Sequence, residues 1–406
     1  MGDKQMKPFG KLMTRLDAVR LIDENVRRIT RVEDVPIEDA AGRVLAEDVV
    51  AGFNVPPFDR SSMDGYAVKA KDTAGASSKP VALALIGARH AGEVFDGVIG
   101  DGECIEIATG APVPRGADAV VMVEYTKLNG DGVEIQREAK PGSNVAPEGE
   151  DIEKGDVVVK AGEVLTPGRI GAVAALGFSK VRAYARPRVA IYSTGNEVTP
   201  QGKPLKPGQV YDINSYTLSA VVAANGCVPV RRGLVSDDFD AIAAAVKDAS
   251  AYDVAVFSGG SSVGVKDLFA GVVEDLGVVH FHGLRVKPGK PTLFGEVAGT
   301  PVFGMPGYST SCLNNAYVFL VPALRRAAGL PAVEERIVKA RLSLVIKAEG
   351  EREQFYSVRV EGGEAVPVFK QSGDITSMAY ANGYIIIPIG TKLLEAGAAV
   401  TVYLFN

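Results

Sequence analysis

The hydrophobic pattern of the chain starts with a helix and then changes to short strands. Behind a Thr-x-x-Asp start, Leu16, Val19, Ile22 and Val26 recur at nearly helical spacing, which predicts an amphipathic helix. Residues 54–140 contain short β-prone runs, among them VALALI, ECIEIA and DAVVMVEYT, separated by Gly, Pro and Asp. This segment is expected to form a small β-rich insertion, and the stretches before and after it to form one discontinuous domain.

From Pro187 onward, strand and helix patterns alternate. Apolar strand patterns such as RVAIYSTG and DVAVFSGG alternate with helical patterns such as NSYTLSAVVAANG and DDFDAIAAAVKDA, and further strands are expected at residues 278–281 and 300–304. This alternation predicts a parallel, doubly wound sheet with helices on both faces, in which ligands bind beyond the carboxyl ends of the strands. After Pro331 only strand patterns recur, which predicts a small C-terminal β barrel or sandwich. The expected fold class is α/β plus β, in several domains.

The composition excludes several classes of protein. Hydrophobic residues make up 47% of the 406 residues, enough for a large core, and 44 Lys+Arg against 49 Asp+Glu give a formal charge of −5. A nucleic-acid partner is not expected, because it needs a basic surface. The 3 cysteines are widely spaced and form no Cys-x-x-Cys pair, so they encode neither a disulfide framework nor a zinc knuckle. The N-terminus lacks an apolar signal core and no apolar run approaches ~18 residues, so we expect a cytoplasmic protein without a membrane partner.

Three segments carry chemistry that suits an anion. The loop SGGSSVG at residues 258–264 follows an apolar strand and precedes a helix, and its free N–H groups suit a phosphate. It is neither a Walker A loop nor a G-x-G-x-x-G motif, and taken alone an ordinary turn explains it equally well. KPGKP places Lys287 and Lys290 around a Pro-Gly turn with both ammonium groups free to meet an anion, unless it is only a solvated surface turn. MPGYSTSC at residues 305–312 repeats the strand, glycine loop and helix arrangement, and helix capping explains only one of its hydroxyls.

Carboxylates follow the ends of several predicted strands. Glu197 in STGNE, Asp237 in SDD and Asp267 in VKD each lie just after or near a strand end, where an acidic helix cap is the alternative explanation. Several acids on one edge of a sheet, opposite lysines and glycine loops, indicate a Mg²⁺-assisted phosphate site, because Mg²⁺ takes hard oxygen ligands and bridges phosphates.

Two polar loops of the β-rich insertion also carry candidate residues. FDRSSMDGYAV at residues 58–68 places Asp59 among other acids and hydroxyls, and IATGAPVPRGADAVVMVE at residues 107–124 presents Thr109 before two turns built from Gly and Pro. On spacing alone these are functional loops, and nothing more specific follows.

Seven segments of the chain resemble the successive signature blocks of the MoeA family, which includes the gephyrin E-domain. The segments are PPFDRSSMDGYAV, ATGAPVPRGADAVVMVE, GSNVAPEGEDIEKGD, RPRVAIYSTGNEV, PGQVYDINSY, SGGSSVG and KPGKPTLFG. They occur in the order typical of that family and span nearly the whole chain.

The resemblance implies an elongated homodimer of four-domain subunits that act on a pterin. The implied parts are a discontinuous N-terminal and dimerisation domain at 1–52 and 141–180, a β-rich inserted domain at 53–140, a MogA-like molybdopterin-binding α/β domain at 181–329 and a C-terminal β barrel at 330–406. The implied reaction is Mg²⁺-dependent and consumes molybdate and adenylyl-molybdopterin. It hydrolyses the phosphoanhydride, releases AMP and leaves molybdenum on the dithiolene.

The resemblance also implies the site residues. The catalytic set is Asp59, Thr109, Glu197, Asp237 and Asp267, of which Glu197, Asp237 and Asp267 would place the metal. The substrate-binding set is Gly259, Gly260, Ser261, Ser262, Lys287, Lys290, Pro306, Gly307 and Ser372, the last of these in the short match QSGDITSM.

Two positions depart from the family pattern. Gly283 stands where many members have a lysine, with Arg285 as the alternative cation, and Ser309 stands where the usual PGNP turn has its second proline. Two other functions stay open. One is the adenylyltransferase of the same pathway, a candidate partner that usually lacks the insertion and the barrel. The other is a dimeric scaffold like the gephyrin E-domain. The set of acids and lysines favours catalysis.

Overall fold

The computed structural model describes residues 12–259 and 265–405, without the side chains of residues 265–267, and the chain forms two compact units. The first unit comprises residues 1–33, 42–44 and 183–406, and the second comprises residues 34–41 and 45–182. No helix in the described ranges is both long and apolar enough to cross a membrane.

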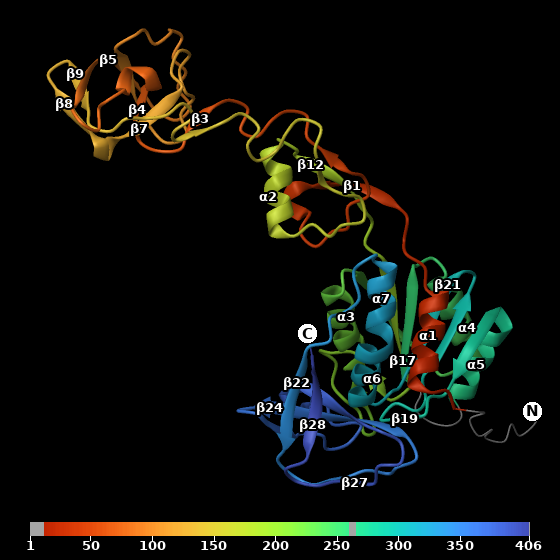
Figure 1. Cartoon of the computed structure of the whole chain (residues 1–406). Helices are drawn as coiled ribbons and strands as arrows, with labels where there is room; N and C mark the ends of the chain where they lie inside the picture. Colours follow the sequence, from red (N-terminus) through yellow and green to blue (C-terminus); the bar gives the residue numbers. More distant parts are fainter. Residues whose placement is uncertain (1–11, 260–264, 406) are drawn as a thin grey trace, which may run out of the picture. The chain divides into compact units, whose positions relative to one another are not determined.

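A six-stranded sheet forms the centre of the first unit, with the strand order β16-β13-β17-β21-β20-β18 (Figure 1). β16, β13, β17 and β21 run parallel, as the alternating strand and helix patterns predict. The strands are β13 (Arg188–Thr194), β16 (Val228–Val235), β17 (Val254–Gly259), β18 (Gly277–His282), β20 (Leu293–Val297) and β21 (Thr300–Met305).

The other end of this sheet contains a hairpin that the sequence analysis did not identify. β20 pairs antiparallel with both β21 and β18, so the sheet is mixed. Val297 pairs with Thr300 across a two-residue turn in which Ala298 and Gly299 have φ angles of 51° and 82°. Two successive residues with positive φ form the turn that matches the twist of a hairpin, but Ala-Gly is not the Asn-Gly or Asp-Gly signal by which such a turn is recognised.

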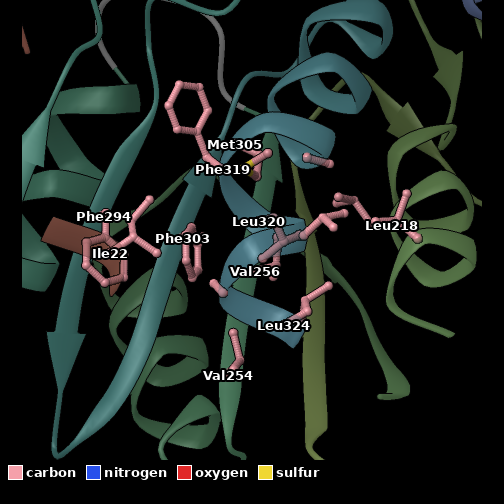
Figure 2. Packing of buried hydrophobic residues seen from close by; sticks show 14 of the residues in the cluster. Ile22, Leu218, Val254, Val256, Phe294, Phe303, Met305, Phe319, Leu320 and Leu324 are labelled. Atoms are coloured by element: carbon pink, nitrogen blue, oxygen red, sulfur yellow. The ribbon is translucent and has the colours of Figure 1, made fainter. Parts of the chain in front are cut away.

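Helices cover both faces of this sheet, and the strands bury alternate residues against each face. In β13, Ile191 packs toward the layer of α1, α3, α6 and α7, whereas Tyr192 packs toward the layer of α4 and α5. In β17, Val256 packs toward the first layer and Phe257 toward the second. Figure 2 shows the first of these two cores, where residues of the sheet, α1, α3 and the chain from α6 to α7 meet. The helices are α1 (Arg15–Asn25), α3 (Asn214–Ala224), α4 (Phe239–Ala249), α5 (Val265–Leu276), α6 (Ser309–Asn315), the π-helical η4 (Ala316–Leu320) and α7 (Val321–Ala327).

The predicted N-terminal helix is present as α1, and Thr14 caps it by accepting a hydrogen bond from the backbone N–H of Asp17. Ile22 and Val26 are buried, but Leu16, expected on the same apolar face, is 69% exposed. α1 packs against the central sheet, because Ile22 and Val26 belong to the same core as the sheet residues.

The C-terminal region forms a closed five-stranded barrel, which resolves the choice between barrel and sandwich. The strands follow the order β24-β25-β22-β28-β26, and β26 pairs with β24 to close the ring. The short β19 (Val286–Lys287) adds to β24 from the α/β domain. The remaining elements are β22 (Ile337–Leu342), β23 (Ile346–Lys347), β24 (Glu353–Glu361), β25 (Glu364–Pro367), α8 (Thr376–Tyr380), β26 (Gly383–Ile387), β27 (Leu393–Leu394) and β28 (Ala399–Leu404).

The second unit contains the predicted β-rich insertion as a six-stranded sheet with the order β7-β4-β6-β5-β9-β8. The chain segments on either side of this sheet pair with each other, β2 with β11 and β3 with β10. The elements are β1 (Val32–Pro36), η1 (Ile37–Asp39), β2 (Val49–Val50), β3 (Arg60–Ser61), β4 (Gly65–Val68), η2 (Ala70–Thr73), β5 (Val81–Arg89), β6 (Glu103–Ile107), β7 (Ala119–Met122), η3 (Val123–Tyr125), β8 (Thr126–Asn129), β9 (Gly132–Ile135), β10 (Val145–Ala146), β11 (Val157–Val159), α2 (Pro167–Ala175) and β12 (Lys180–Tyr184).

Candidate active site

The carboxyl ends of four parallel strands bring most of the predicted site residues of the first unit to one edge of the sheet. Thr194 at the end of β13 pairs with Val235 of β16 and with Gly259 of β17, and Ser258 pairs with Met305 of β21. The loops that follow these strands therefore start side by side. We call this edge, with the loops that leave it, the strand-end rim.

Gly259 is required by the close approach of two strands. Its φ angle is +128°, and a Cβ atom there would lie 1.8 Å from the carbonyl oxygen of Thr194. Only glycine fits a backbone this close to its neighbour. The hydroxyl of Ser258 is buried and has no hydrogen-bond partner among the described residues. The predicted ligand-binding positions Gly260, Ser261 and Ser262 lie outside the described residues.

Two of the three predicted metal-binding acids lie in loops at the rim. The carboxylate of Asp237 accepts a hydrogen bond at 3.2 Å from the backbone N–H of Asn196, the residue before Glu197. Burial raises the pKa of Asp237, and the negative charge of Glu197 raises it further, while the Asn196 N–H opposes both. Oδ1 of Asp237 is buried and has no partner in the described part of the chain.

The third predicted acid cannot be placed in the same way. The backbone of Asp267 lies in the first turn of α5, after the rim loop of β17, and its side chain is outside the described residues. Within the described residues, no three or more His, Cys, Asp or Glu side chains form a group that could hold a metal ion. Glu197 and Asp237 nevertheless offer hard oxygen atoms, the ligand type that Mg²⁺ takes, and one oxygen of Asp237 is buried without a partner among the described residues.

Two polar residues of the rim were missed in the sequence analysis. Asp212 is 8% exposed; it accepts hydrogen bonds from the hydroxyl of Ser193 at 3.0 Å and from the backbone N–H of Ser215 at 3.1 Å. The side chain of Asn214 donates to the carbonyl oxygen of Gly307 at 2.9 Å. Both residues lie in the motif PGQVYDINSY, whose position before a helix was the available signal.

The lysine turn differs from the expectation in one respect. The ammonium group of Lys287 is not free: it forms an ion pair with Glu349 of the barrel, which also pairs with Arg352. These two cations lower the pKa of Glu349. Lys287 lies in β19, beside β24, so the barrel supplies this carboxylate at the point where the lysine turn begins. Lys290 is half-buried.

A buried asparagine holds the tip of the lysine turn, and no pattern in the sequence indicates this contact. The side chain of Asn315, fully buried in α6, donates to the carbonyl oxygen of Gly289 at 2.9 Å and to the hydroxyl of Thr292 at 2.7 Å. Gly289 has a φ angle of +96°, and a Cβ atom there would lie 2.3 Å from the Asn315 amide nitrogen. The turn is therefore packed against α6 rather than solvated on all sides.

The barrel also contacts the rim through the loop that contains Ser372. The hydroxyl of Ser309 donates to the carbonyl oxygen of Gly373 at 3.0 Å, and the hydroxyl of Thr310 donates to the carbonyl oxygen of Asp374 at 2.9 Å. The backbone N–H of Thr310 donates to the carbonyl oxygen of Ser372 at 3.1 Å. These hydroxyls fix the barrel loop and do not cap α6, so the capping explanation is wrong. The backbone of Ser372 thereby lies against the start of α6.

The second unit brings Asp59 and Thr109 onto neighbouring segments. The backbone of residues 59–61 is hydrogen-bonded to that of residues 110–113. Asp59 accepts a hydrogen bond from the N–H of Glu148 at 2.8 Å, and Asp64 accepts two from Thr109, at 2.7 Å from N–H and 2.8 Å from the hydroxyl. The two bonds from Thr109 lower the pKa of Asp64, so this loop carries a carboxylate that stays ionised.

The cavities and cysteines of the first unit contribute little to the rim chemistry. A cavity of about 760 Å³ runs along α1, α3, α7 and β28, and none of the predicted site residues lines it. A cavity of about 30 Å³ lies beneath Gly259 and Met305. Cys227 and Cys312 are buried, and burial raises their pKa, the former to about 12, so neither is a nucleophile.

We predict that Gly259→Ala destabilises the α/β domain by more than ~2 kcal/mol, because it adds strain at positive φ and a contact with Thr194. Gly271→Ala is the matched control: its added Cβ meets no heavy atom within 4 Å, and alanine favours a helix by ~1 kcal/mol over glycine. Urea unfolding of both variants measures the difference. Equal midpoints would show that the rim tolerates a side chain at residue 259.

Comparisons with known proteins agree with this geometry over nearly the whole chain. Residues 13–177 match the family description "MoeA N-terminal region (domain I and II)", residues 190–326 match "Probable molybdopterin binding domain", and residues 339–405 match "MoeA C-terminal region (domain IV)".

Full-length relatives and solved structures give the same result. The molybdopterin molybdenumtransferase of Haemophilus influenzae is 33% identical, with 93% of this chain and 95% of that protein covered, and that of Bacillus subtilis is 34% identical, with 95% and 94% covered. The crystal structure of a molybdopterin biosynthesis MoeA protein from Pyrococcus horikoshii is 41% identical, covers 98% of this chain and 100% of its own, and has a TM-score of 0.85. The chain therefore belongs to the MoeA family.

Proposed function

We propose that this protein inserts molybdate into adenylyl-molybdopterin and releases AMP, which completes the molybdenum cofactor. The observation that carries the proposal is the strand-end rim, where the loops that carry Glu197 and Asp237 follow two strands paired side by side, next to Gly259. The names of the full-length relatives supply the substrate class. The adenylyltransferase of the same pathway would supply the substrate.

Each group at the rim has a proposed task. Gly259 and the loop after it bind the phosphates through backbone N–H groups, and Lys287 and Lys290 neutralise their charge. Pro306, Gly307 and Ser372 bind the substrate next to the barrel. The pair Glu197 and Asp237, with Asp267 from α5, would hold Mg²⁺, which supplies charge neutralisation of the diphosphate when it is bound. The acids also orient the water that attacks the phosphoanhydride, so that one P–O bond breaks as another forms and AMP leaves.

The assembly and location belong to the same proposal. The subunit would comprise the four domains that the family resemblance implies, and two subunits would form a closed homodimer in the cytoplasm. Asp59 and Thr109, on neighbouring segments of the second unit, would complete the site of the other subunit.

We expect Asp237→Asn to lower molybdate-dependent AMP release at least ~100-fold, equivalent to about 2.7 kcal/mol of transition-state stabilisation. The amide keeps the acceptor for the Asn196 N–H but lacks the charge. Asp238→Asn is the matched control, because this neighbour caps α4 through the N–H of Ala241 and asparagine caps equally well. Near-normal turnover of Asp237→Asn at saturating Mg²⁺ would refute its role.

Lys287 and Glu349 allow a second comparison. Lys287→Ala should weaken binding of adenylyl-molybdopterin about 10-fold, since a charge-assisted hydrogen bond of about 1.4 kcal/mol is lost. Glu349→Gln, which frees the lysine, should leave affinity equal or higher. Titration calorimetry gives both values. If both variants instead bind the substrate normally and their melting temperatures fall by the same amount, Lys287 serves only the ion pair with Glu349.

The dimer proposal predicts complementation between two inactive variants. Asp59→Asn and Asp267→Asn each inactivate the homodimer, but a mixed dimer collects both defects in one of its two sites and leaves the other intact. Mixing the two proteins should therefore restore up to about half of normal activity in each heterodimer. Verified heterodimers that stay inactive would show that Asp59 acts within its own subunit or only shapes its loop.

A further inference from the structure

We propose that the ring of Tyr308 is a stacking surface for a heteroaromatic ring of the substrate, and so a specificity-determining residue of the strand-end rim. This inference rests on the proposed function, because adenylyl-molybdopterin carries two such rings, the pterin and the adenine, at the ends of its diphosphate. It assigns a task to a residue that no predicted role covers.

The position of Tyr308 is the first argument. β21 ends at Met305, which pairs with Ser258, the residue before Gly259. Tyr308 follows Pro306 and Gly307 directly and forms the N-cap position of α6 without a side-chain capping bond. Its ring therefore leaves the main chain at the rim, within three residues of the end of the strand that adjoins the glycine loop.

The backbone that carries this ring is held on both sides. Before it, the carbonyl oxygen of Gly307 accepts the hydrogen bond from Asn214 at 2.9 Å. After it, Thr310 is bound to the barrel loop by its N–H and its hydroxyl. The carbonyl oxygen of Tyr308 accepts a hydrogen bond from the backbone N–H of Cys312 at 2.8 Å. A ring mounted on a fixed backbone loses little conformational freedom when a ligand binds, which favours its use as a contact surface.

The ring itself is left open. Tyr308 is 60% exposed, and one edge lies against Gly373, where a Cβ atom would be 3.6 Å from the ring. Among the described residues, its ring has no aromatic or cationic partner and its hydroxyl has no hydrogen-bond partner. Other exposed tyrosines differ: Arg231 lies over the ring of Tyr216, and the hydroxyl of Tyr211 donates to the carbonyl oxygen of Lys203. One exposed aromatic residue is ordinary. An open ring on a fixed backbone, three residues after the strand that pairs with Ser258, is a built surface.

The chemistry of the substrate requires such a surface. Amide groups and lysines bind a diphosphate whatever rings it carries, so they do not select the pterin or the adenine. Stacking of one flat heterocycle on an aromatic side chain changes affinity about tenfold or more. Either ring of adenylyl-molybdopterin satisfies this chemistry, and the two are distinguished by titration of the separate halves.

The test compares Tyr308→Ala with Tyr308→Phe in the full-length protein. Each variant is titrated with adenylyl-molybdopterin, with AMP and with molybdopterin, and assayed for molybdate-dependent AMP release. We expect Tyr308→Ala to raise the Kd and KM for adenylyl-molybdopterin about tenfold with kcat within about twofold, and Tyr308→Phe to match the wild type. Loss of affinity for AMP alone assigns the adenine, and loss for molybdopterin alone assigns the pterin.

The control is Tyr380→Ala, which removes a tyrosine of similar exposure, 63%, from the end of α8 rather than from a loop that follows a sheet strand. It should bind all three ligands normally. Unchanged affinity of Tyr308→Ala for all three would overturn the inference, as would an equal loss in Tyr308→Phe, which would indicate a hydroxyl contact instead of stacking. A wild-type protein that neither binds adenylyl-molybdopterin nor releases AMP would refute the proposed function, which is a different outcome.

Discussion

The parallel alignment of β16, β13, β17 and β21 is the constraint on which the rest of the site depends. Both faces of β13, β17 and β21 are buried, and β17 packs Val256 toward one helical layer and Phe257 toward the other. A shift of one residue would exchange the two sets of side chains, so packing fixes the register. Once the register is fixed, the loops after the strands must start together, and Gly259 must be glycine because the main chain of Thr194 is too close for a side chain.

The barrel is a structural part of this rim. Three hydrogen bonds join the barrel loop around Ser372 to the start of α6, and Glu349 pairs with Lys287 where β19 joins β24. A domain held only by a linker would make neither set of contacts. The barrel therefore fixes the α6 turn and sets the charge near the lysine turn, so changes in its loops act on the site without changing the sheet.

Sequence periodicity predicted the sheet, the helical layers and the barrel because each depends on repeated patterns of buried residues. It failed where a single contact decides the outcome. The turn at Ala298 lacks the usual hairpin residues, Leu16 has helical spacing but faces solvent, and Lys287 is paired with a residue 62 positions away in the chain. Long-range pairs and isolated hydrogen bonds, such as that of Asn315, leave no periodic trace in the sequence.

The electrostatics of the rim show that Asp237 does not stabilise the fold through its charge. The negative charge of Glu197 raises the pKa of Asp237 in addition to the effect of burial, so the folded chain holds this carboxylate under less favourable conditions than water does. Oδ1 of Asp237 has no partner among the described residues, and a buried acceptor left unpaired costs about 1–3 kcal/mol. The Asn196 N–H compensates only in part, because it reaches the other oxygen. On the proposed function, Glu197 and Asp237 would hold a cation, whose positive charge would offset this repulsion. On the same proposal, the two acids oppose folding by their repulsion and contribute to binding through their charge.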